Sequence, residues 1–313
     1  MHNWIAKIMD RPTVTGAGDH PISVPLELSE FIASCRHLSV GGQFYEGIAP
    51  SCARLYFVLH GKWTLTTSGV AAEAFANDAI LMGPTSRASG ISSSGGSLVV
   101  LEISAIGWLK LVSAPAHIAA NQLFRSQLIG NWSKQVFVPA MAPQSSEAVA
   151  LTFDTAGIKH FRASPRETLV RYIASALNAG SFATVDQLAQ SAGISSRRLY
   201  RCCIDAFGFG PKTLLKRQRL LRGLQNMHAV SSHKIADIVP LDYFDQSHFN
   251  RDFKSVMGAT PTEYRRHASN FLPPLIVSLE QRSRCGEIPV SSPVASVVWS
   301  KRLPPQDRAE ALR

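Results

Sequence analysis

Two segments in the last third of the chain share one pattern, and that pattern constrains the fold more than any other feature. Each begins with a residue that can cap a helix, Ser195 in one and Asp245 in the other, followed by apolar residues at helical spacing. The first segment follows a tight turn at residues 192–194 and an earlier helix that starts with the capping box Thr184–Gln187. Helix, tight turn and helix make up the helix-turn-helix layout. We therefore expect two such units in an all-α region.

The outward sides of the two capped helices are the candidate binding surfaces. Packing of the apolar stripe leaves polar and basic side chains outside, where arginine can bond a guanine edge or hold a phosphate. An ordinary solvated face would have the same composition. The outward residues are Ser196, Arg197, Tyr200 and Arg201 in the first unit, and Gln246, Ser247, Asn250 and Arg251 in the second.

A basic helix between the two units favours DNA binding over the solvated-face interpretation. Within residues 211–229 we expect one helix of roughly 17 residues, about 25 Å long, which could hold two recognition helices near the ~34 Å repeat of major grooves. The net charge of +10 is concentrated in this part of the chain. Residues 185–270 hold thirteen Lys/Arg against seven Asp/Glu, whereas residues 1–150 hold nine of each.

The segments "LAQSAGISSRRLYRCCIDAFGFGPKTLLKRQRL" and "DQSHFNRDFKSVMGATPTEYR" resemble the DNA-binding domain of AraC/XylS-type transcription regulators over about residues 165–268. The second segment keeps the family pattern closely, whereas the first has Cys203 where an aromatic residue is usual. The resemblance implies that the base-facing positions are Arg197, Tyr200, Arg201, Gln246, Ser247, His248, Asn250 and Arg251.

One departure from the family lies before the second unit. The run "KIADIVPLDYFDQ" is one residue short, with Pro240 inside it and Asp242 where the family has glycine. Proline in a helix interior costs about 3 kcal/mol, and a non-glycine residue at a left-handed turn adds roughly 1 kcal/mol. We therefore expect the first unit to contribute most of the affinity for DNA.

The first part of the chain is rich in short β-type runs such as "ARLYFVLHGKWTLTT" and "GGSLVVLEIS". We expect a hairpin turn at Gly61, a turn at "AND" before a buried strand, and one or two helices in residues 105–135 that cover a barrel or mediate dimerisation. These runs resemble the cupin-like domains of many such regulators. Cupin enzymes hold a metal with an HxH pair, but His60 is followed by Gly61 and Lys62, so we expect no metal site and no cofactor.

The predicted fold is α+β with two domains: a cupin-like antiparallel β-barrel with covering helices, then an all-α double helix-turn-helix domain. The expected boundaries are 1–150 for a sensor and dimerisation domain, 151–164 for a linker, 165–268 for the DNA-binding domain and 269–313 for an irregular tail. Five scattered cysteines, no signal-peptide core and no run of roughly 18 apolar residues predict a cytoplasmic protein without a membrane segment.

The function that these features favour is a sequence-specific DNA-binding transcriptional regulator, an activator rather than a repressor, controlled by a small-molecule effector that the sequence does not identify. Promoter DNA, RNA polymerase and a second copy of the chain are the expected partners, and no catalytic residue is expected. Two alternatives stay open. One is an interaction protein of the same fold with impaired DNA binding, and the other is a cysteine-based DNA-repair methyl acceptor. A hydrolase built from Asp245, Ser247 and His248 is excluded because neighbours on one helix do not face each other.

Overall fold

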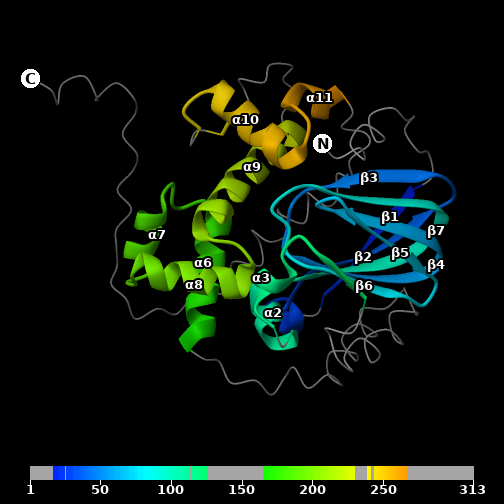
Figure 1. The fold of residues 1–313 in the computed structure, drawn as a ribbon, viewed down its shortest axis with the longest axis horizontal. Helices are drawn as coiled ribbons and strands as arrows, with labels where there is room; N and C mark the ends of the chain where they lie inside the picture. Colours follow the sequence, from blue (N-terminus) through cyan, green and yellow to red (C-terminus); the bar gives the residue numbers. More distant parts are fainter. Residues whose placement is uncertain are drawn as a thin grey trace, which may run out of the picture.

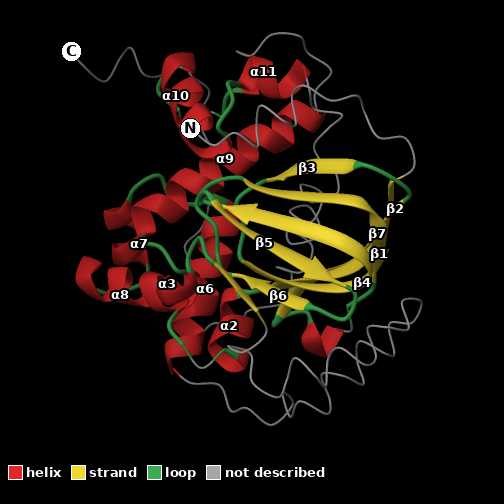
Figure 2. Ribbon diagram, turned by 45° about the vertical axis from the view of Figure 1, so that its right-hand side comes forward, coloured by secondary structure: helices red, strands yellow, loops and turns green. Residues whose placement is uncertain are grey.

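The computed structural model describes residues 17–24, 26–112, 114–125, 165–229, 238–240 and 243–266. A large antiparallel sheet lies beside a group of helices, and two short helices lie between them (Figures 1 and 2). No helix in these ranges is long and apolar enough to cross a membrane. The predicted linker 151–164 and tail 269–313 fall outside the described residues, so the domain boundaries stay a prediction.

The sheet has eight strands, and every pair is antiparallel. Its order is β1-β2-β7-β4-β6-β8, with β3 paired to β7 and β5 to β4. The predicted antiparallel β-domain is confirmed, but no pairing between β1 and β8 closes the sheet into the predicted barrel within the described residues. The strands are β1 (Ala17–Ile22), β2 (Ile32–Val40), β3 (Phe44–Ile48), β4 (Ala53–Thr67), β5 (Val70–Phe75), β6 (Ala79–Met82), β7 (Ser89–Ile103) and β8 (Leu123–Arg125).

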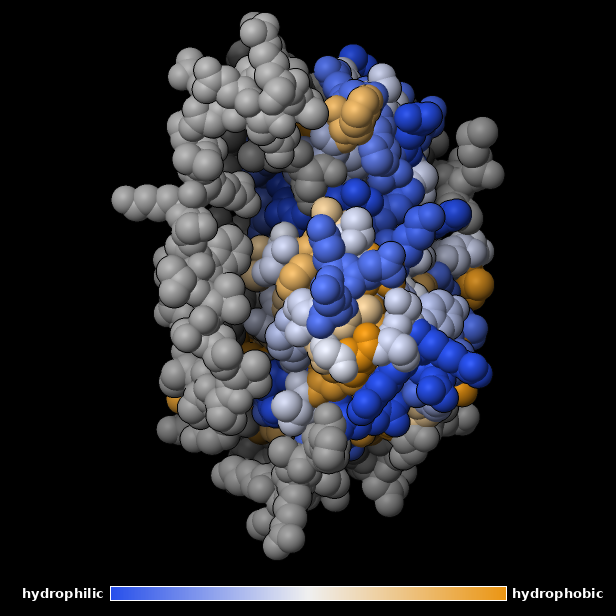
Figure 3. All heavy atoms as spheres, turned by 90° about the vertical axis from the view of Figure 1, so that its left-hand side faces the viewer, coloured by the Kyte–Doolittle hydropathy of each residue, from blue (hydrophilic) through white to orange (hydrophobic). Residues whose placement is uncertain are grey.

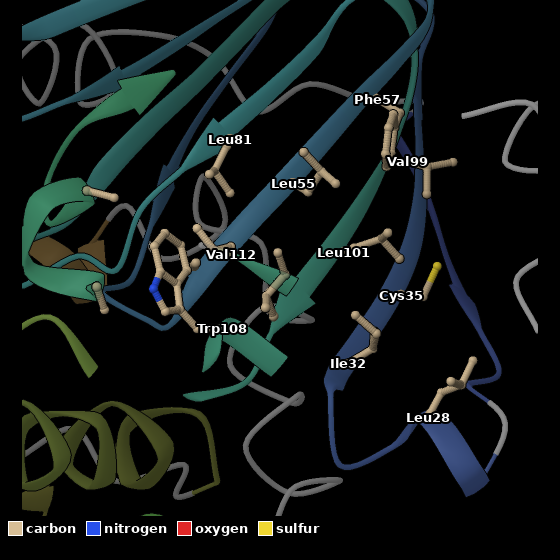
Figure 4. Close-up of a cluster of buried hydrophobic side chains, with 14 of the residues drawn as sticks. Leu28, Ile32, Cys35, Leu55, Phe57, Leu81, Val99, Leu101, Trp108 and Val112 are labelled. Carbon is tan, nitrogen blue, oxygen red and sulfur yellow. The ribbon is translucent and has the colours of Figure 1, made fainter. Parts of the chain in front are cut away.

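Both faces of β4 are buried over residues 53–59 and both faces of β7 over residues 97–103, which explains the mostly apolar sequence of these two stretches. Leu55 and Phe57 belong to the cluster drawn in Figure 4, together with Trp108. Tyr56 and Val58 alternate with them and pack into a second cluster on the opposite face.

Gly61 is not a hairpin turn, and that prediction is wrong. Strand β4 runs through it, with shifts of register on both sides. Gly61 adopts a φ of 80°, and a Cβ there would lie 2.0 Å from the carbonyl oxygen of Gly95 on β7. The chain instead reverses at Ser68 and Gly69, between β4 and β5. The predicted turn before β6 is confirmed, and Asn77 has a φ of 71° there.

Residues 105–125 form two helices and a strand. Helices α2 (Ala105–Leu111) and α3 (Ala116–Ala119) agree with the prediction, whereas β8 is a strand because Leu123 and Phe124 pair with β6. Residues 126–135 lie outside the described residues. Helix α2 joins two cores, since Trp108 packs on the sheet and Ile106 on the helices.

The described residues between 165 and 266 form helices and no strand, as predicted for this region. Helix α9 has 19 residues and leads from the first group of helices to the second (Figure 1). The helices are α6 (Pro165–Ala179), α7 (Val185–Ser191), α8 (Ser196–Phe207), α9 (Pro211–Ala229), α10 (Gln246–Met257) and α11 (Pro261–Arg266).

Polar contacts join the sheet to these helices at several points. The guanidinium of Arg217 on α9 donates to the carbonyl oxygens of Ser51 and Thr85, at 3.0 and 3.3 Å. The amide of Ala88 donates to the carbonyl oxygen of Val256 on α10, at 2.8 Å. Lys110 on α2 forms an ion pair of 2.7 Å with Glu167 on α6. The loops next to the sheet and helix α2 therefore contact α6, α9 and α10.

Candidate nucleic-acid interface

Helix α8 presents the first candidate surface. The hydroxyl of Ser195 accepts a bond from the amide of Arg198 (3.3 Å), so the predicted cap is confirmed. Leu199, Cys203 and Ala206 are buried, as their spacing predicts. All four predicted residues of this unit are exposed: Ser196, Arg197, Tyr200 and Arg201.

Helix α7 and the turn after it position α8. Thr184 and Gln187 form the predicted capping box, and Gly193 takes a φ of 64° in the turn. The hydroxyl of Ser196 lies 3.4 Å from a carboxylate oxygen of Asp186 on α7. Ser196 thus contacts the preceding helix, whereas Arg197 and Arg201 extend from the exposed side one turn apart.

Tyr200 is 53% exposed and lies over the turn between α8 and α9. A Cβ on Gly210 would come within 2.8 Å of its ring. Glycine at 210 therefore leaves room for the Tyr200 ring against this turn, while about half of the side chain stays exposed.

Helix α10 presents the second candidate surface. A carboxylate oxygen of Asp245 accepts a bond of 2.6 Å from the backbone amide of His248, which confirms the predicted cap. Phe249, Phe253 and Val256 are buried, and Tyr264 of α11 packs edge-on against Phe253. Of the predicted residues, Gln246, Ser247 and Arg251 are exposed, whereas His248 and Asn250 are half-buried.

The resemblance implies that His248 and Asn250 both face DNA, but in the structure the two side chains are half-buried. The His248 ring meets the Tyr243 ring edge-on at 5.1 Å, and its Nε2 lies 3.7 Å from Asp252. Asn250 buries its side-chain oxygen, which has no hydrogen-bond partner among the described residues. These two side chains are therefore less available to DNA than Gln246, Ser247 and Arg251.

The two units repeat one geometry. Helices α8 and α10 each have 12 residues, and each ends at a glycine with left-handed backbone, Gly208 (φ 83°) and Gly258 (φ 78°). Three residues after each glycine a proline begins the next helix, Pro211 and Pro261. Figure 3 shows the side of the molecule that carries α7 and α8, where hydrophilic atoms predominate.

The residues of "DQSH" and the adjacent Cys202 and Cys203 do not form the sites that a triad or a reactive methyl acceptor would require. Asp245 bonds the backbone of His248 rather than its ring, so the residues of "DQSH" do not assemble a triad. Burial raises the pKa of Cys203 to about 12 and also raises the pKa of Cys202. A methyl acceptor needs a thiolate, which a raised pKa disfavours. No group of three or more metal-binding side chains occurs in the described ranges.

Two residues near the candidate surface, Lys216 and Phe244, are not among those that the sequence predicts. Lys216 on α9 bonds Asp252 of α10 at 2.8 Å and so braces the second unit against the connecting helix. Phe244, next to the cap of α10, is 93% exposed. Its neighbour Tyr243 is buried, and only the tertiary structure shows which of these two aromatic residues points inward.

Residues 188–267 match a family model described as a helix-turn-helix domain, which confirms the prediction of helix-turn-helix units in this region. No curated protein matches the chain. Among solved structures, ToxT from Vibrio cholerae aligns with 81% of this chain and 99% of its own, at 15% identity and a TM-score of 0.44.

Two further structures are similar to parts of the chain. The AraC-like transcriptional activator CuxR aligns with 62% of this chain and 77% of its own (16% identity, TM-score 0.29). A cupin superfamily protein from Desulfitobacterium hafniense aligns with 30% and 82% (9% identity, TM-score 0.25). At TM-scores below 0.5, none of the three likenesses supports an argument about activity.

Proposed function

We propose that the chain is a sequence-specific DNA-binding transcriptional regulator whose helices α8 and α10 enter successive major grooves. The observation that carries this proposal is the repeated unit: two capped 12-residue helices at either end of α9, each with an exposed polar and basic side. The match of residues 188–267 to a helix-turn-helix domain supports it. Arg197, Arg201 and Arg251 supply the charge that phosphates and guanine edges require.

Regulation is proposed to come from the sheet. It contacts the first unit through α2 and α6, and the second through Ala88 and α10. A small molecule that shifted the sheet relative to these contacts would change the placement of the recognition helices. We propose that the chain is an activator that contacts RNA polymerase at promoter DNA in the cytoplasm. It would do so without catalytic residues. The proposed assembly is a homodimer.

The experiment is a fluorescence anisotropy titration. The wild-type chain first selects a duplex from a random pool, and its affinity is then measured between about 50 and 200 mM salt. The proposal predicts a linear fall of log affinity with log salt, since each neutralised phosphate releases counterions. Failure to select any duplex at the lowest salt would overturn it and favour the alternative, an interaction protein of the same fold.

A further inference from the structure

Phe244 is the most exposed large hydrophobic side chain among the described residues, at 93%. It lies directly before Asp245, the cap of α10, and so next to the end of the recognition helix that carries Gln246 and Ser247. An apolar ring that is exposed to solvent at this place does not take part in core packing, so any role that it has lies in a contact with another molecule.

The fold itself does not use this ring. A hydrophobic residue just before a helix cap often packs against the fourth residue of the helix, which here is Phe249. Tyr243 makes that contact instead, since its ring lies edge-on to Phe249 at 5.1 Å and it is only 7% exposed. With Tyr243 turned inward, Phe244 is left outside.

The described residues that follow Phe244 on α10 expose polar and basic side chains. Gln246, Ser247 and Arg251 are exposed on α10, and the Arg219 guanidinium lies 5.4 Å from the centre of the Tyr243 ring. No other large hydrophobic residue between 211 and 266 is exposed within the described ranges. A protein partner would be expected to meet a broader apolar patch, whereas a single aromatic ring among cationic and amide side chains matches duplex DNA.

The major groove offers one apolar group to such a ring, the C5 methyl of thymine. Residues at the start of a recognition helix are those that meet base edges. We propose that Phe244 contacts a thymine methyl at the edge of the half-site bound by α10 and thereby selects thymine at that position. This inference rests on the proposed DNA-binding function and adds a specificity determinant to it.

The test removes the methyl from the DNA and the ring from the protein. In the duplex that wild type selects, each thymine in turn is replaced by deoxyuridine, which lacks only the C5 methyl. We expect one position where this weakens wild-type binding roughly fourfold, the effect of burying one methyl-sized group. In Phe244→Ala the same replacement should change affinity by less than about 1.5-fold, because the partner ring is absent.

Phe75→Ala is the matched control, since Phe75 is half exposed on β5 and far in sequence from α10. It should keep the wild-type difference between thymine and uracil. Thermal unfolding of Phe244→Ala should match wild type, because the ring contributes little to the core.

Two results would overturn the inference. In one, the affinity of the wild type does not change when uracil replaces thymine at any position. In the other, the replacement weakens binding by Phe244→Ala as much as binding by the wild type. If wild type binds with steep salt dependence but shows either result, the inference alone fails. If wild type selects no duplex, the proposed function and the inference fail together.

Discussion

The carboxyl group of Glu46 stands out among individual residues. It lies on β3 and is buried, and one of its oxygens has no hydrogen-bond partner in the described part of the chain. Burial, reinforced by the charge of Asp19, raises its pKa well above the usual range. The charge of Glu46 in turn helps to raise the pKa of Tyr264 on α11, after the larger effect of burial.

We predict that Glu46→Gln stabilises the protein increasingly as pH rises. Because the pKa is higher in the folded chain, the contribution of Glu46 to stability is fully present below the unfolded pKa of about 4.3 and is lost as pH rises through the folded value. Glutamine removes this dependence. Urea unfolding between pH 5 and pH 8 should show a gain of roughly 1 kcal/mol at the upper end and less at the lower end.

Glu73→Gln is the control for this series, since Glu73 forms a solvent-exposed ion pair with Lys62. It should give no gain that grows with pH. A Glu46→Gln gain that is equal at both ends of the range would contradict the account.

At the scale of elements, α8 and α10 are alike in geometry but differ in what they expose. Arg197 and Arg201 are both outward on α8, whereas α10 has Arg251 outward with His248 and Asn250 half-buried. The expectation that the first unit dominates affinity stays a prediction, because most of the short segment before Tyr243, residues 230–237 and 241–242, lies outside the described residues.

We predict that Arg197→Ala and Arg201→Ala each weaken binding to the selected duplex about tenfold, a loss within the range for one arginine contact. Arg251→Ala should weaken it less. Anisotropy titrations at one fixed salt concentration compare the three variants. Intact binding in both α8 variants, together with loss of binding in Arg251→Ala, would show that the second unit dominates instead.

Structural features that depend only on residues within one or two helical turns could be predicted from the sequence. The caps Ser195 and Asp245 and the Thr184 capping box depend on local hydrogen bonds, so their sequence signatures sufficed. Gly61 was misinterpreted because its conformation depends on Gly95, a residue of a partner strand 34 positions away. The inward turn of His248 likewise depends on the Tyr243 ring and Asp252, which no local pattern specifies.

For the whole molecule, the buried Arg217 is the main polar link between α9 and the sheet. We predict that Arg217→Met lowers the free energy of unfolding by about 2 kcal/mol, since methionine keeps the stem but leaves two carbonyl groups without this donor. Urea unfolding measures the change. Lys212→Met, at an exposed position of the same helix, should have almost no effect. Equal stability of Arg217→Met and wild type would mean that the link is energetically unimportant.

The Arg217 contact also affects how the two helix-turn-helix units are placed relative to each other. Because loops next to the sheet contact α9 at Arg217 and α10 at Val256, we infer that the placement of α8 and α10 depends on more than α9 alone. The central claim is therefore that the two helices bind DNA simultaneously at a fixed separation.

Hydroxyl-radical footprinting of the wild-type chain on its selected duplex tests this claim most directly. The account predicts two protected segments whose centres lie one helical turn apart, about 10 to 10.5 base pairs. A single protected segment, or two at a spacing that places the helices on opposite faces of the duplex, would contradict it.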